Sequence, residues 1–224
     1  MPSLKPTRIF IVDDHPLVRE WLAALLRQQA GLTICGQAED AATALAAMTK
    51  TPPDVAIVDI SLKTGSGLDL IKDLQAVLPD VAVIVLSMHE EIFYAERALR
   101  AGARGYVMKR ESTSQIIDAI RQVRDGRVYA NPEVLGRLAE RLVGRSAAAR
   151  GTVEGLSDRE LEVFRRLGRG EPTRQIASEL HLSIKTVQAY NARIKEKLGL
   201  PSGAQLVREA VRWVEHENGN PVNP

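Results

Sequence analysis

The chain has 224 residues, of which 45% are hydrophobic and 26% charged, a composition that suits a globular protein with one large or two small domains. Its formal net charge of +2 is unevenly spread: residues 1–127 hold 15 Lys and Arg against 16 Asp and Glu, and residues 128–224 hold 15 against 12. The basic excess therefore lies in the second half, the part better suited to a polyanion. The single cysteine, Cys35, excludes a disulfide framework and a thiolate zinc site. No apolar run approaches the roughly 20 residues that span a bilayer and no signal-peptide core is present, which predicts a cytoplasmic protein without a membrane partner.

Residues 8–124 alternate between short apolar runs and amphipathic helical patterns. Runs rich in Val and Ile predict strands at 8–14, 33–38, 55–60, 81–87 and 105–109. The spacing of apolar side chains predicts helices at 16–29, 41–49, 67–77, 90–101 and 112–124. The strand runs are almost continuously apolar, which is typical of strands buried on both faces. Five βα units with right-handed crossovers predict a five-stranded parallel sheet with helices on both sides.

Residues 128–152 differ in character from the part before them. The stretch NPEVLGRLAERLVG predicts one short helix, with Asn131 as its cap and Pro132 in its first turn. The following GRSAAARGTVEG is rich in Ala, Gly and Arg and has no hydrophobic periodicity, which predicts a flexible linker.

The chain from 156 onwards is predicted to be helical. Ser157 and Glu160 have the spacing of a capping box, which starts a first helix. A second helix at about 173–180 and a tight turn lead into a third helix at 184–198, and a fourth starts at Ser202. Helix, tight turn and helix in this order are typical of a DNA-reading module.

Polar side chains follow the predicted strands where each strand ends. They are Asp13 and Asp14 after the first run, Asp59 after the third, Ser87 at the end of the fourth and Lys109 at the end of the fifth. Burying an unpaired carboxylate in a core costs several kcal/mol, so these are poor core residues. The carboxyl ends of parallel strands share one edge, where such folds place their sites, so we expect the five side chains to converge.

Three carboxylates, a hydroxyl and an ammonium suit a divalent cation and a phosphoryl group. Mg²⁺ prefers oxygen ligands, and a cation or Lys109 would relieve the repulsion between the acids. Asp59 is the candidate nucleophile, while Lys109 and Ser87 would contact phosphoryl oxygens. His15 and His89 border the site, and we expect exposed loop histidines rather than ligands of Mg²⁺.

The motifs IVDDHPLVR, VAIVDISL, VIVLSMH and GARGYVMKR make residues 7–126 similar to the receiver domains of two-component response regulators. The resemblance implies a flavodoxin-like α/β domain that takes a phosphoryl group from a sensor histidine kinase onto Asp59. It also implies that Mg²⁺ is held by Asp14, Asp59 and the Ser61 carbonyl, with Asp13 acting through a water molecule.

Ser87 and Tyr106 resemble the family's switch pair, a hydroxyl and an aromatic ring that shift together on phosphorylation. Half-buried packing is the alternative interpretation of Tyr106. Two positions depart from the family pattern, because Lys63 and Arg110 stand where many receivers have Pro. Neither departure removes a reactive group.

The third helix of the second half has an apolar inner face around Val187 and Ile194 and a thin outer face with Lys185, Ala189, Ala192 and Glu196. Small side chains would let the helix approach a groove closely. A solvated helix surface would show nearly the same pattern, so the pattern alone favours DNA only slightly.

The motifs LSDRELEV, IASEL, LSIKTV and IKEKLG make residues 153–215 similar to the LuxR-type helix-turn-helix of NarL/FixJ-type response regulators. The resemblance implies base contacts by Gln188, Ala189 and Ala192. It implies phosphate contacts by Lys185, Thr186, Arg193 and Lys195. Tyr190 and Asn191 depart from the His and Arg that are common there. The last helix resembles the one that pairs two copies on DNA, although plain packing would give it the same apolar face.

The sequence therefore predicts an α/β flavodoxin-like receiver followed by a small all-α helix-turn-helix domain. The predicted boundaries are 1–127 for the receiver, 128–152 for a linker with a short helix, 153–217 for the DNA-binding domain and 218–224 for a flexible tail. We expect a regulator that a sensor histidine kinase phosphorylates on Asp59, which promotes homodimers and changes binding to a double-stranded promoter operator. The family's receiver dimer surface would lie around Leu17, Trp21, Ile117 and Arg121.

Two other classes of protein were considered. A haloacid-dehalogenase-like phosphatase uses the same groups but carries its nucleophile in a DxD motif, and the residue two positions after Asp59 is Ser61. This difference disfavours a turnover enzyme. A constitutive DNA-binding protein with a silent receiver is disfavoured by the intact set of acids, hydroxyl and lysine.

Overall fold

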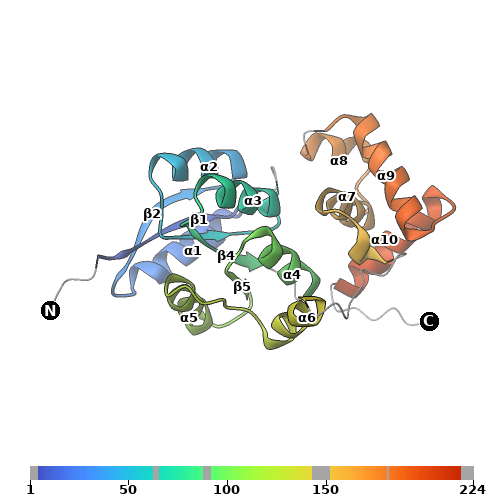
Figure 1. Ribbon diagram of the computed structural model, residues 1–224. Helices are drawn as coiled ribbons and strands as arrows, with labels where there is room; N and C mark the ends of the chain where they lie inside the picture. Colours follow the sequence, from blue (N-terminus) through green and yellow to red (C-terminus); the bar gives the residue numbers. More distant parts are fainter. Residues whose placement is uncertain (1–4, 63–65, 88–91, 143–151, 181, 218–224) are drawn as a thin grey trace. The chain divides into compact units, whose positions relative to one another are not determined.

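A computed structural model of the protein describes residues 5–62, 66–87, 92–142, 152–180 and 182–217 (Figure 1). Lys63, His89, most of the predicted flexible linker and the predicted tail lie outside these ranges. The chain divides into two compact units, Met1–Leu138 and Ala139–Pro224. None of the described helices is both long and apolar enough to cross a membrane.

The first unit alternates strands and helices along the chain. Its strands are β1 (Thr7–Val12), β2 (Leu32–Ala38), β3 (Val55–Val58), β4 (Ala82–Ser87) and β5 (Gly105–Met108). Its helices are α1 (Pro16–Arg27), α2 (Ala41–Lys50), α3 (Gly67–Val77), α4 (Ile92–Ala101) and α5 (Thr113–Arg124). The strands form one parallel sheet in the order β2-β1-β3-β4-β5. The predicted α/β class with a five-stranded parallel sheet is confirmed.

Three strands are shorter at their carboxyl ends than the sequence predicted. The strand predicted at 8–14 ends at Val12, the one at 55–60 ends at Val58, and the one at 105–109 ends at Met108. Each ends at the last apolar residue before a charged one. The chain leaves the sheet where the charges begin, so the charged side chains gather at one edge instead of lying within the core.

Helices cover both faces of the sheet (Figure 1). On one face, Leu22 and Leu26 of α1 and Ile116 and Ile120 of α5 join the strands in one buried cluster. α2 and α3 lie on the opposite face, and α4 packs beside α3. Within β1 the successive residues at 9–11 are each at most 3% exposed, so both faces of the strand are covered. This explains why the apolar runs were continuous rather than alternating.

The segment after α5 returns to the sheet and lies beside β5. The Tyr106 N–H donates to the Tyr129 carbonyl over 2.8 Å, and the Tyr129 N–H donates to the Arg104 carbonyl over 2.9 Å. α6 (Pro132–Leu142) then begins at Pro132, as predicted, and its Val134 is buried. Residues at the start of the predicted linker are therefore hydrogen-bonded to the edge of the sheet.

The second unit is helical where it is described. It contains a short 3₁₀ turn at Val153–Gly155 and the helices α7 (Asp158–Gly168), α8 (Thr173–Glu179), α9 (Ile184–Leu198) and α10 (Gly203–Glu217). The predicted cap of α9 is present, because Ser183 Oγ accepts a hydrogen bond from the Thr186 N–H over 3.0 Å. Phe164 is fully buried, with its ring 5.8 Å from that of Trp213. The predicted helix-turn-helix arrangement of α8 and α9 is confirmed.

Gly67 opens α3 at the point where this helix meets the end of β3. A Cβ atom at this position would lie 2.2 Å from the carbonyl oxygen of Asp59 and 2.7 Å from the Cα of Ile60. Both are backbone atoms, which cannot move aside as a flexible side chain can. The absence of a side chain lets α3 start this close to the turn that carries Asp59.

Glu160 ties α7 to α9. Its Oε2 accepts hydrogen bonds from the Ser157 N–H over 2.7 Å and from the Lys197 ammonium over 2.6 Å. Burial raises the pKa of the Glu160 carboxyl, but the contacts with Lys197 and Ser157 outweigh it and hold the pKa below its usual value. Because the folded pKa is the lower one, the carboxylate stabilises the folded unit at neutral pH.

We expect Gly67→Ala to lower the free energy of unfolding by about 1–3 kcal/mol, the usual cost of overpacking. Gly136→Ala in α6 is the matched control, because a Cβ atom there would meet nothing within 4 Å. The control is expected to be neutral or to stabilise the protein by up to about 1 kcal/mol, since Ala favours helix. Urea unfolding followed by circular dichroism measures both changes, and equal effects would contradict the steric argument.

Glu160→Gln keeps an oxygen for the Ser157 N–H but removes the charge that binds Lys197. We expect it to lower the free energy of unfolding of the second unit by about 0.2–1 kcal/mol at pH 7, because Lys197 is partly exposed. The difference should be complete above the usual pKa of a Glu carboxyl and disappear as the pH falls through the lower pKa of the folded protein.

The measurement is urea unfolding followed by Trp213 emission in a Trp21→Phe background. Glu196→Gln, at an exposed position of α9, is the control and should change little. A Glu160→Gln effect that persisted in acid would mean that packing rather than charge is responsible.

Candidate functional site

Backbone hydrogen bonds carry the ends of the strands one residue further and so bring the polar side chains together. The Asp13 N–H donates to the Ala38 carbonyl over 3.2 Å, and the Asp59 N–H donates to the Val12 carbonyl over 2.8 Å. At the same edge of the sheet, between β4 and β5, the Lys109 N–H donates to the Ser87 carbonyl over 2.7 Å. Each residue is held on a neighbouring strand before its side chain enters the site. The sheet order reverses between β1 and β3, which is where such folds bind ligands.

Lys109 bridges two of the acids. Its Nζ lies 2.6 Å from Asp13 Oδ2 and 2.7 Å from Asp59 Oδ2, and the three side chains are 8%, 3% and 4% exposed. Burial lowers the pKa of Lys109, but the two carboxylates outweigh it and hold the pKa above its usual value. Burial raises the pKa of Asp59, and Lys109 acts in the opposite direction. The ammonium is therefore the charge that keeps the acids close together.

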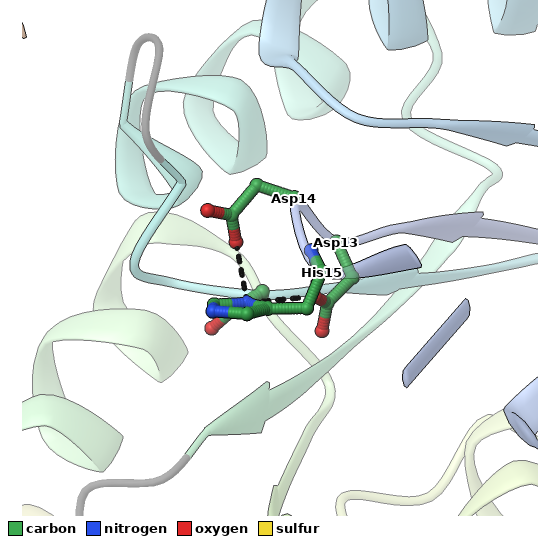
Figure 2. A group of neighbouring side chains, drawn as sticks. Asp13, Asp14 and His15 are labelled. Carbon is green, nitrogen blue, oxygen red and sulfur yellow. Dashed lines mark hydrogen bonds and ion pairs between the residues drawn. The ribbon is translucent and has the colours of Figure 1, made fainter. Parts of the chain in front are cut away.

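Asp14 and His15 form the outer part of the site (Figure 2). The Nδ1 of His15 lies 2.9 Å from Asp14 Oδ1 and 3.4 Å from Asp13 Oδ1. The side chain of His15 is 58% exposed, as expected of a loop histidine, while that of Asp14 is 4% exposed. His15 nevertheless contacts both acids, and no spacing pattern in the sequence predicted that contact.

The donor set fits a hard divalent cation. Potential ligand atoms of Asp13, Asp14, His15 and Asp59 all lie within 4.8 Å of one another. A divalent cation would relieve the repulsion among the three carboxylates. Most of the donors are carboxylate oxygens, which Mg²⁺ prefers. The Ser61 N–H donates to Asp59 Oδ1 over 3.1 Å, which places the loop after β3 against the same carboxylate.

Ser87 and Tyr106 lie on neighbouring strands with their side chains on the same face. Val85 pairs with Tyr106 and Ser87 pairs with Met108, so Ser87 is two residues along from the partner of Tyr106. Ser87 is 0% and Tyr106 is 7% exposed. This arrangement suits both the predicted switch and simple packing of Tyr106.

The sequence analysis missed Arg19 of α1. Its Nη1 donates to the Asp13 carbonyl over 2.5 Å and its side chain is 16% exposed. The signal available in the sequence was a basic residue on the otherwise apolar face of α1. Arg19 fixes the backbone of the turn from which Asp13 and Asp14 project.

The predicted outer face of α9 is exposed. Its exposed members are Lys185, Gln188, Ala189, Ala192 and Arg193, while Thr186 and Lys195 are half-buried. Val187 and Ile194 on the inner face are fully buried. The guanidinium of Arg193 lies 5.9 Å from the centre of the Tyr190 ring, within the range of a cation–π contact. Within the second unit, α9 thus presents small and basic residues to solvent, together with the acidic Glu196.

A parallel sheet with buried acids and a lysine at its carboxyl edge, followed by a helix-turn-helix unit, is the arrangement of a response regulator. The sequence matches the family model of the response regulator receiver domain over residues 9–121. It matches that of the bacterial regulatory proteins of the luxR family over residues 154–210. The chain therefore belongs to the two-component response regulators of the NarL/FixJ type, which are DNA-binding regulators of transcription.

Known proteins resemble the chain over most of its length. A protein of Pseudomonas aeruginosa is 38% identical over 206 residues, which is 92% of this chain and 98% of that protein. The response regulator GacA of the same organism is 32% identical over 205 residues, 92% of this chain and 95% of GacA. A solved structure of the response regulator RcsB of Salmonella typhimurium is 27% identical, with a TM-score of 0.69, and covers 93% of this chain and 98% of that one. RcsB of Salmonella enterica serovar Typhimurium, solved bound to a promoter with the phosphomimetic BeF₃⁻, is 26% identical with a TM-score of 0.65, over 91% and 98%.

Lys109→Met should lower the free energy of unfolding of the first unit by about 3–5 kcal/mol without divalent cations, because it leaves two buried carboxylates without their ammonium. Arg110→Met, at the exposed neighbouring position, is the matched control and should cost about 0.5 kcal/mol or less. Scanning calorimetry measures both variants. A Lys109→Met chain as stable as the control would refute the charge balance described above.

Proposed function

We propose that Asp59 is the phosphoacceptor of this response regulator and that a sensor histidine kinase is the donor. The observation that carries the proposal is the ammonium of Lys109, which holds Asp13 and Asp59 together at the reversal point of the sheet. A carboxylate oxygen of Asp59 attacks the phosphorus, and the bond from phosphorus to the donor histidine breaks. The electron pair of that bond remains with the imidazole.

The surrounding residues have separate tasks in this transfer. Lys109 moves from the carboxylate of Asp59 to an oxygen of the phosphoryl group, and Ser87 donates a hydrogen bond to another. Mg²⁺ would be held by Asp14, Asp59 and the Ser61 carbonyl, with Asp13 acting through a water molecule. When bound, the ion neutralises charge on the phosphoryl oxygens. Gly67 keeps the turn with Asp59 close to α3, so the nucleophile stays at a fixed depth.

The chain acts as a switch rather than as a turnover phosphatase. Ser61 stands two residues after Asp59, where such phosphatases carry the second acid of their motif. Ser87 turns toward the phosphoryl group and Tyr106 shifts with it. The backbone N–H of Tyr106 is bonded to the Tyr129 carbonyl, so displacement of β5 would reach the segment that leads into α6.

Phosphorylated receivers form homodimers. Exposed side chains on α1 and α5 support this proposal. On α1, Leu17 is 80% and Trp21 is 44% exposed, and on α5 Arg121 is exposed. Ile117, which the sequence placed on the same surface, is only 8% exposed and is left out of the proposed contact. Pairing two chains aligns two DNA-reading helices with the half-sites of one operator.

The second unit reads double-stranded promoter DNA through α9, in the cytoplasm. Gln188, Ala189 and Ala192 face the bases, and Lys185, Thr186, Arg193 and Lys195 lie near phosphates. The exposure of Gln188 and the two alanines supports this assignment, because a long side chain between small ones can enter a groove. The half-buried Thr186 is bonded to the cap residue Ser183, so we expect it to contact phosphate through its exposed edge.

A small phosphodonor with Mg²⁺ should add one phosphoryl group to the chain, at Asp59. Intact-mass spectrometry should show the addition in the natural chain and none in Asp59→Asn. Asp54→Asn, at the opposite end of the same strand, is the matched control and should be labelled like the natural chain. Complete labelling of Asp59→Asn would overturn the assignment.

Lys185→Ala and Gln188→Ala should affect DNA binding in different ways. Loss of a phosphate contact by Lys185 should weaken all sequences alike and reduce the salt dependence by about one charge. Loss of a base contact by Gln188 should cost about 1–3 kcal/mol on the preferred site only. Fluorescence anisotropy on a selected operator and on random DNA over a salt series measures both, and equal weakening of both DNAs by Gln188→Ala would argue against an inserted helix.

A further inference from the structure

His15 has its backbone fixed at both ends and its ring against the acids. Its N–H donates to Asp13 Oδ1 over 2.8 Å, and its carbonyl accepts from the N–H groups of Val18 and Arg19 over 3.1 and 3.2 Å. Pro16 follows it as the first residue of α1. The backbone of His15 is therefore held in place, and from this position its ring lies against Asp13 and Asp14 (Figure 2).

We propose that His15 Nδ1 is an additional ligand of the cation site, which thereby accepts first-row transition ions in preference to Mg²⁺. The inference rests on the proposed function, in which Asp14, Asp59 and the Ser61 carbonyl would hold a divalent cation and Asp13 would act through a water molecule. It adds a nitrogen donor to a site that otherwise offers oxygens. Imidazole suits ions such as Co²⁺, Ni²⁺ and Zn²⁺ better than Mg²⁺, which prefers oxygen.

The distance from His15 to Asp14 matches that between neighbouring ligands of one ion. Two ligands that each lie about 2.1 Å from a six-coordinate ion, at a right angle, are about 3 Å apart. His15 Nδ1 lies 2.9 Å from Asp14 Oδ1, a direct ligand in the proposed function. An ion bound beside these atoms would therefore need little rearrangement of the ring.

The exposure of the His15 side chain also bears on how the cation site meets solvent. The acids are buried, but the imidazole is 58% exposed and forms the solvent side of the cluster. Among these side chains, His15 is therefore the one most accessible to solvent. The alternative role is a hydrogen bond from the ring to Asp14, which would make His15 compete with the cation instead of binding it.

Pulsed electron paramagnetic resonance of the full chain with Mn²⁺ distinguishes these roles, because a nitrogen ligand modulates the signal of the bound ion. We expect nitrogen modulation in the natural chain and in His216→Gln, a control that removes a histidine from α10. The modulation should be absent from His15→Gln. Calorimetry with Co²⁺ and Mg²⁺ completes the test: His15→Gln should lower Co²⁺ affinity by at least about tenfold and Mg²⁺ affinity by less than about threefold.

The possible outcomes separate this inference from the proposed function. Bound Mn²⁺ without nitrogen modulation, or modulation that persists in His15→Gln, would overturn the role of His15 but leave the carboxylate site intact. Tighter binding of both ions by His15→Gln would establish the competing hydrogen bond and refute the ligand. Asp14→Asn should abolish binding of all three ions, and undiminished binding would overturn the proposed cation site together with the inference. Retained Mg²⁺ binding by His15→Gln shows that this variant is folded.

Discussion

The ammonium of Lys109 between Asp13 and Asp59 is the interaction on which the first unit depends. Two carboxylates that are almost fully buried repel each other and have lost their hydration, and a single charge held at hydrogen-bonding distance from both offsets these costs. Lys109 follows β5 whereas the acids follow β1 and β3, so the contact exists only when the strands are ordered as they are here. The order of the strands therefore determines the site. Asp14 adds a third carboxylate beside this pair, and a cluster of carboxylates is the electrostatic reason to expect a divalent cation.

Backbone contacts around this pair decide how accurately the groups are placed. The turn after β1 is held by Arg19, which binds the Asp13 carbonyl, and by His15, whose N–H binds the Asp13 carboxylate. The turn after β3 is held against α3 through Gly67. Two of these contacts fix main-chain atoms, and the His15 N–H holds the Asp13 carboxylate itself. The proposed transfer, in which Lys109 changes its partner, requires this kind of support.

The second unit is organised by a different balance of forces. An aromatic core around Phe164 and Trp213 holds the helices, and the Glu160–Lys197 ion pair joins the start of α7 to the last turn of α9. The inner face of α9 is fixed by burial of Val187 and Ile194, and the outer face is left with small and basic residues. Burial therefore determines the direction in which Gln188 points. The side chains that we propose to contact DNA are mostly exposed and contribute little to the stability of the unit.

Much of the fold and many of the site residues could be predicted from the sequence. Continuous apolar runs predicted a sheet covered on both faces, and the charges at their ends predicted a common edge, because burial of apolar side chains and exclusion of unpaired charges act at each position separately. The predicted carboxyl ends of β1, β3 and β5 were one or two residues too late. The predicted strands included the charged residues, whereas the sheet ends before them because unpaired charges are excluded from the core. The helix caps at Ser157 and Ser183 could be predicted because each cap is a local contact between residues three positions apart.

Contacts between distant residues were decided only by the tertiary structure. The bridge from Lys109 to both acids, the contact of His15 with Asp14, and the pairing of Tyr129 with β5 each depend on strand order or side-chain direction. The hydrophobic pattern of a segment reports whether it is buried but not which other segment buries it. The sequence by itself determined the elements and the kinds of chemical group at their ends. The fold determined which of those groups touch, because only the packed sheet brings residues separated by 50 positions within hydrogen-bonding distance.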